Sequence, residues 1–238
     1  MRAIRIILGI ALVVTIASPG AGWAKATFAK AACAVPRGWR VLTQDRYAVV
    51  IARRRILIVR RPSGQLPNHK YCSRSGGGFH PVPLSGGTGG CGGCLGPLPD
   101  QIRDLRLKGR YLAYDDSPRL GGGRNVIGPY MWIIDTRTGR SRHAGDAGAT
   151  SQQAVATSPV ELSDDGVAVR IATYLRRGGP ITVVEALTPS SSTWLDDDSA
   201  PGSITDIQLY DCAAGCAPDT TVVAWTHDGQ RRYATVTG

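Results

Sequence analysis

The chain has 238 residues, of which 42% are apolar and 6% aromatic, and its formal net charge is +10. This composition excludes a disordered or low-complexity protein, and the length suits one ordinary domain with a proper core. The 28 basic residues are spread over the chain rather than gathered on one helix or tail. The charge alone therefore does not predict a nucleic-acid partner.

Residues 1–26 have the layout of a cleaved signal peptide. Arg2 and Arg5 precede an apolar run at residues 6–17, and Ala24 and Ala26 supply the small residues that a signal peptidase recognises. A membrane anchor is the alternative, but the run is well short of the ~20 residues that a membrane span needs. We therefore expect a secreted, extracellular protein with no stable membrane anchor, whose single mature domain covers residues 27–238.

Six cysteines in an exported chain predict three disulfides. They are Cys33, Cys72, Cys91, Cys94, Cys212 and Cys216. Spacing favours two short local bridges, Cys91–Cys94 and Cys212–Cys216, which leaves Cys33 to pair with Cys72. A redox-active CxxC at residues 91–94 is an alternative, but no helix is predicted there to lower the thiol pKa. Zinc binding is a weaker alternative, because no second CxxC pair or histidine companion is present.

A pair of short apolar strands returns four times along the chain. The pairs are residues 47–51 with 55–59, 110–114 with 131–135, 166–170 with 181–185, and 221–225 with 232–236. Alternating segments, typical of half-buried strands, precede the pairs at residues 39–41, 105–107, 160–162 and 207–209. A turn and a weaker fourth segment, such as residues 193–195, follow the second strand. Each repeat is therefore predicted to be an antiparallel meander.

The repeats cover approximately residues 38–80, 101–145, 158–200 and 203–238, and they recur about every 60 residues. A four-stranded propeller blade has roughly 40–50 residues, so the copies carry loop insertions, the largest at residues 76–99. The last repeat ends after its third strand. We expect the N-terminal segment around Cys33 to supply the missing fourth strand and so close a ring.

Residues 109–114 and 131–139, which include Asp135 and Gly139, resemble the blade repeat of TolB-type, WD40-like secreted β-propellers. The third repeat departs from that pattern, with Glu185 where Asp135 stands in the second. The resemblance implies an all-β fold, namely a propeller-like ring of about four antiparallel meander repeats that is either closed or irregular. It implies no particular activity, because propellers host many functions.

No catalytic motif is present in the sequence: nucleophile elbow, zinc-protease motif, phosphate loop and dinucleotide fingerprint are all absent. The four histidines, His69, His80, His143 and His227, have no partner nearby in the sequence. Three carboxylates at comparable repeat ends, Asp116, Asp165 and Asp198, are weak candidates for Ca²⁺ ligands. The alternative is that they serve as turn residues. We expect no other cofactor.

Two functional hypotheses remain. In the first, the protein is a secreted, non-catalytic binding or scaffolding module, which uses the loops of a β-propeller-like scaffold to hold a protein or glycan ligand. It is expected to be a monomer that binds no nucleic acid, and Trp194 is its candidate exposed aromatic. In the second, it is a propeller-type hydrolase or lyase whose channel-lining carboxylates, Asp116, Asp165 and Asp198, act with or without a metal.

Overall fold

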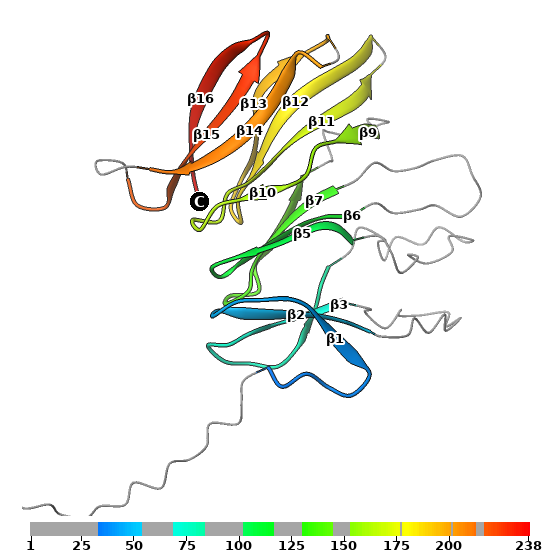
Figure 1. Ribbon diagram of the computed structural model, residues 1–238, viewed down its shortest axis with the longest axis vertical. Helices are drawn as coiled ribbons and strands as arrows, with labels where there is room; N and C mark the ends of the chain where they lie inside the picture. The colour runs from blue at the N-terminus through cyan, green and yellow to red at the C-terminus, as the bar shows by residue number, and fades with distance from the viewer. Residues whose placement is uncertain are drawn as a thin grey trace, which may run out of the picture. The chain divides into compact units, whose positions relative to one another are not determined.

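The computed structural model describes residues 33–53, 69–83, 102–116, 130–144, 153–176, 178–200, 202–212 and 217–238. These residues form sixteen β-strands and no helix, and they belong to one compact unit, residues 31–238 (Figure 1). The expected all-β fold is thereby confirmed. Within the described part of the chain, no helix is long and apolar enough to cross a membrane.

The strands form four antiparallel sheets that follow one another along the chain. The first sheet contains β1 (Trp39–Gln44), β2 (Ala48–Arg53), β3 (His69–Ser73) and β4 (His80–Pro81). The second contains β5 (Ile102–Lys108), β6 (Tyr111–Asp116), β7 (Tyr130–Asp135) and β8 (Ser141–Ala144). Each of these sheets is a meander whose strands are neighbours in chain order, as predicted.

The third sheet contains β9 (Gln153–Thr157), β10 (Glu161–Leu162), β11 (Ala168–Arg176), β12 (Gly179–Leu187) and β13 (Ser192–Asp198). Among the described residues, the fourth contains β14 (Ile204–Asp211), β15 (Thr220–His227) and β16 (Gln230–Thr237). β9 and β10 both pair with β11, at different points along it. They act as one interrupted strand, because Pro159 lies between them and has no amide hydrogen to donate to a neighbouring strand.

In the first sheet the neighbour of β2 differs from the predicted one. β2 pairs with β1 on one side and with β3 on the other. The predicted second strand, residues 55–59, lies outside the described residues. β3 places Tyr71 and Cys72 in the buried interior. The polar residues around them did not predict a buried strand.

An apolar cluster joins each sheet to the next. Alternate side chains of β6 face opposite ways: Leu112 and Tyr114 pack with the first sheet, and Tyr111 and Ala113 pack with the third. Because both faces of β6 are covered, all six of its residues are buried. A further cluster, which includes Val169 and Trp225, joins the third sheet to the fourth. Among the described residues no such cluster joins the fourth sheet to the first, and no closed ring is observed.

The predicted disulfide between Cys33 and Cys72 is present, with the two Cα atoms 5.6 Å apart. It ties the segment before β1 to β3. Cys212 is also disulfide-bonded. Its predicted partner Cys216, and the predicted pair Cys91 and Cys94, lie outside the described residues, as does the proposed signal peptide.

Candidate functional sites

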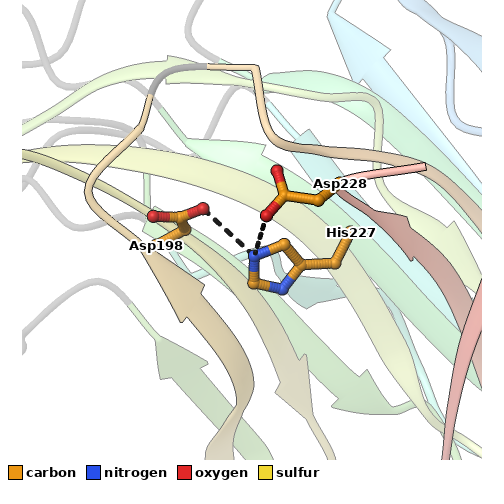
Figure 2. Close-up of side chains that lie close together, drawn as sticks. All are labelled: Asp198, His227 and Asp228. Carbon is orange, nitrogen blue, oxygen red and sulfur yellow. Dashed lines mark hydrogen bonds and ion pairs between the residues drawn. The ribbon is translucent and has the colours of Figure 1, made fainter. Parts of the chain in front are cut away.

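The structure does not gather the three predicted metal ligands into one site. Asp116 is buried at the end of β6, Asp165 lies in the turn between β10 and β11, and Asp198 ends β13. Among the described residues, the group of side chains that could share a metal ion contains Asp198 but neither of the other two. The partners of Asp198 are His227 and Asp228 (Figure 2).

His227 ends β15 and lies between carboxylates on both sides of its ring. Its Nδ1 is 2.7 Å from Asp196 Oδ2, and its Nε2 is 3.0 Å from Asp198 Oδ2 and 3.8 Å from Asp228 Oδ2. The histidine itself is buried, with 7% of its surface exposed. The sequence separates it from Asp196 and Asp198 by about thirty positions, so no local motif pointed to the cluster.

The hydrogen bonds of this cluster favour its charged forms. The bond to Asp196 raises the pKa of His227, against the opposing effect of burial. The Ala200 amide, the Ser203 hydroxyl and the His227 ring lower the pKa of Asp198 to about 2. Burial disfavours the ionised form of Asp196, but hydrogen bonds from Trp225 and His227 outweigh it and lower its pKa. The cluster therefore contains ionised carboxylates at neutral pH.

A second site lies where the hairpin turns of the sheets meet. These turns line a pocket of about 700 Å³, called here the turn-end pocket. Its charged lining includes Arg46, Arg74, Arg110, Arg137, Asp164 and Asp219. All four sheets contribute, because the arginines come from the first and second sheets and the aspartates flank strands of the third and fourth.

The arginines of the turn-end pocket are only partly neutralised. Among the described residues, Arg46, Arg74 and Arg137 form no ion pair with a carboxylate, whereas Arg110 Nε is 3.7 Å from Asp135. Arg74 is instead held by the backbone carbonyl of Asp45 at 2.9 Å and by the side chain of Gln44. Arginines without carboxylate partners that line one pocket are the arrangement that binds carboxylate, sulfate or phosphate groups.

Aromatic rings support two of these arginines. Arg46 lies over the ring of Tyr47, 4.7 Å from its centroid, and Arg110 lies 4.9 Å from that of Tyr111. Tyr111 is buried, but Tyr47 is 42% exposed and also lines the pocket. The pocket thus combines cations, an accessible ring and, on the side of the third and fourth sheets, carboxylate acceptors.

Trp194, the predicted exposed aromatic, lies elsewhere. It is half-buried on β13, where it stacks on Tyr174 with 6.0 Å between ring centroids and lies under Arg176. Its ring faces are therefore occupied within the protein. The accessible ring at a pocket is that of Tyr47, which the sequence pattern placed at the start of an apolar strand.

Comparison with known proteins finds no matching family model, no matching curated protein and no matching solved structure. The likeness to TolB-type propeller repeats therefore rests on the residues of the second repeat alone.

Proposed function

We propose that the protein is a secreted, non-catalytic binding module that binds an acidic glycan in the turn-end pocket. The observation that carries the proposal is the set of four arginines, three of them without a carboxylate partner, that line one pocket. Each guanidinium offers paired donors to a carboxylate or a sulfate. An anionic ligand supplies the charge that these side chains lack.

The remaining lining favours a sugar over an acidic peptide. Asp164, which also pairs with Lys108, and Asp219 offer carboxylate oxygens as acceptors, and a sugar presents a row of hydroxyl donors that acidic peptide side chains do not have. The exposed ring of Tyr47 offers an apolar face against which the C–H face of a sugar ring can pack. A uronate or sulfated residue therefore fits both sides of the pocket.

The proposal includes the scaffold and its location. The four sheets act as blades of a propeller-like ring, which is supported by one pocket lined from all four sheets and by the apolar clusters between successive sheets. Export through the N-terminal signal peptide is supported by the disulfide Cys33–Cys72, which fits an oxidising compartment. An enzyme with channel-lining carboxylates is not proposed, because Asp116, Asp165 and Asp198 do not come together.

The test is calorimetric titration of the mature protein with a galacturonate hexamer and with a neutral galactose hexamer. We expect the acidic hexamer to bind at least about tenfold more tightly, and its affinity to fall as salt is added. Arg137→Gln should weaken binding about fivefold or more, which corresponds to roughly 1 kcal/mol for a partly exposed charged contact.

Arg142→Gln is the matched control, because Arg142 is an exposed arginine on β8 of the same sheet and does not line the pocket. It should leave the affinity unchanged. Equal losses in the two variants would indicate attraction by net charge alone. Equal affinity for the two hexamers would contradict the proposal.

A further inference from the structure

We propose that Asp198, His227 and Asp228 form a binding site for Zn²⁺ at the ends of β13 and β15. One donor atom from each side chain lies within 4.8 Å of the other two (Figure 2). One imidazole nitrogen and two carboxylate oxygens are ligands that zinc accepts, and a water can complete a tetrahedron. The site is separate from the turn-end pocket and does not depend on the proposed glycan binding.

The donor atoms already lie close to the positions that zinc requires. In a tetrahedral site with metal–ligand bonds of ~2.0–2.1 Å, neighbouring donor atoms are about 3.4 Å apart. The distances from His227 Nε2 to Asp198 and Asp228 are 3.0 and 3.8 Å, on either side of that value. The two carboxylate oxygens lie within 4.8 Å of each other, so side-chain rotation brings the three donors to the tetrahedral spacing.

Local structure fixes two of the three ligands. The second carboxylate oxygen of Asp198 accepts the amide of Ala200 at 3.0 Å, so its free oxygen is aimed at the histidine. Asp228 occupies the left-handed region with φ 50°, and with Gly229 it forms the two-residue turn between β15 and β16. This turn places the Asp228 carboxylate beside His227, and its 72% exposure leaves a path for the ion.

The surroundings of His227 match those of a metal-ligating histidine. Nδ1 faces Asp196, which also accepts a hydrogen bond from Trp225 Nε1 at 2.6 Å and is contacted by Arg232 at 3.1 Å. A carboxylate at Nδ1 fixes the ring and directs the lone pair of Nε2 outward, which is the usual outer-shell arrangement around zinc. Asp196 is thus a positioning residue, not a ligand.

The charge of the cluster also favours a divalent cation. Three carboxylates, those of Asp196, Asp198 and Asp228, lie beside the His227 ring and one guanidinium, that of Arg232. With the imidazole as a neutral ligand, the carboxylates exceed the guanidinium by two negative charges, which one zinc ion balances. Ca²⁺, the ion anticipated from the sequence, is a poorer match because it takes oxygen ligands.

The experiment titrates the metal-free mature protein with zinc chloride in a calorimeter and records the d–d absorption after Co²⁺ substitution. We expect one zinc ion per chain, a tetrahedral Co²⁺ spectrum, and no competition from an equal concentration of Ca²⁺. Asp228→Asn should weaken zinc binding at least about tenfold. This variant keeps a residue that tolerates the left-handed backbone and leaves the Asp196 contacts intact.

Asp206→Asn is the matched control, because Asp206 is also an exposed aspartate with a positive φ, 52°, and is not part of the cluster. It should bind zinc as the parent does. His227→Gln should abolish the Co²⁺ spectrum. The proposal is overturned if no stoichiometric zinc binds, or if Asp228→Asn and the parent bind equally, which would assign the zinc to other groups. Either result leaves the glycan titration unaffected.

Discussion

Arg170 places a full positive charge between the second and third sheets, where it has no exposed surface. Its Nη1 is 2.7 Å from Asp115 on β6, and its Nε is 2.8 Å from Glu185, the residue opposite it on β12. Tyr174 donates its hydroxyl to the same Glu185. Removing one partner of such a buried pair is strongly destabilising, because it leaves the other charge unpaired. These residues therefore fix how β6 faces β11 and β12.

Asp115 gives this network a pH dependence. Burial raises the pKa of Asp115 from 3.8 to about 6, and the attraction of Arg170 only partly opposes it. Between these two values the folded protein holds a proton that the unfolded chain has lost. The free energy of unfolding should therefore fall as the pH rises from about 4 to 6, by up to ~3 kcal/mol, and then level off.

The measurement is urea unfolding of the parent and of Asp115→Asn across this pH range. Asn cannot ionise, so the parent should lose stability relative to the variant as the pH rises. A difference that stays flat, or that changes in the opposite direction, would show that Arg170 holds the pKa of this carboxyl near or below its usual value.

At the level of single elements, the turn between β10 and β11 is fitted closely to a neighbouring sheet. Gly166 has φ +81°, and a Cβ at this position would lie 2.6 Å from the ring of Tyr111. The Tyr111 hydroxyl receives a hydrogen bond from Arg110 at 2.6 Å, so the ring is restrained. Glycine is therefore required both by the backbone and by the contact.

Gly166→Ala should destabilise the fold by about 1–3 kcal/mol more than Gly229→Ala does. Gly229 has a similar φ of +74°, but no atom lies within 4 Å of its added Cβ, so it isolates the backbone cost of roughly 1–2 kcal/mol. Overpacking against a restrained ring adds a further ~1–3 kcal/mol. Chemical denaturation of both variants measures the difference, and equal losses would mean that Tyr111 moves freely.

The positions of strands could be predicted from the sequence wherever a segment is continuously apolar or alternates between apolar and polar residues. The runs that became β6, β7 and β12 are apolar because they are covered on both faces, and the alternation of β5 and β14 marks strands with one exposed face. β3 was not predicted, because its polar ends, His69 and Ser73, give it neither an apolar run nor an alternating pattern. Its burial depends on packing against other strands and on the Cys33–Cys72 bridge.

The candidate sites were less accessible to prediction. Asp198 was identified, but its partner His227 lies on β15 of the fourth sheet, and only the packing of the third sheet against the fourth brings the two side chains together. The arginines of the turn-end pocket were interpreted as dispersed surface charge for the same reason. Each is isolated in the sequence, and their proximity is a property of the assembled turns.

At the scale of the whole molecule, the fourth sheet has three strands in the described part of the chain, and β16 pairs there only with β15. If the N-terminal segment completes this sheet, deletion of residues 27–37 should lower the melting temperature of the whole domain. The deletion also removes Cys33, and loss of a disulfide that closes a loop of this length costs roughly 4 kcal/mol.

Cys33→Ala/Cys72→Ala is therefore the control, since it removes the bridge and keeps the segment. The deletion should melt at a clearly lower temperature than this double variant, as followed by calorimetry. Equal melting temperatures would show that the segment acts only through its disulfide, and ring closure by the N-terminus would then be excluded.

The chain-order arrangement of the sheets has a consequence for how the protein folds. Each meander pairs strands that are close in sequence, so each can form as soon as its own residues are free to fold. Each new sheet, however, leaves an uncovered apolar face until its successor arrives, as Tyr111 and Ala113 do until the third sheet packs on them. Folding should therefore pass through intermediates with exposed apolar faces, and slow packing of one sheet on the next would leave those faces open to aggregation or to chaperones.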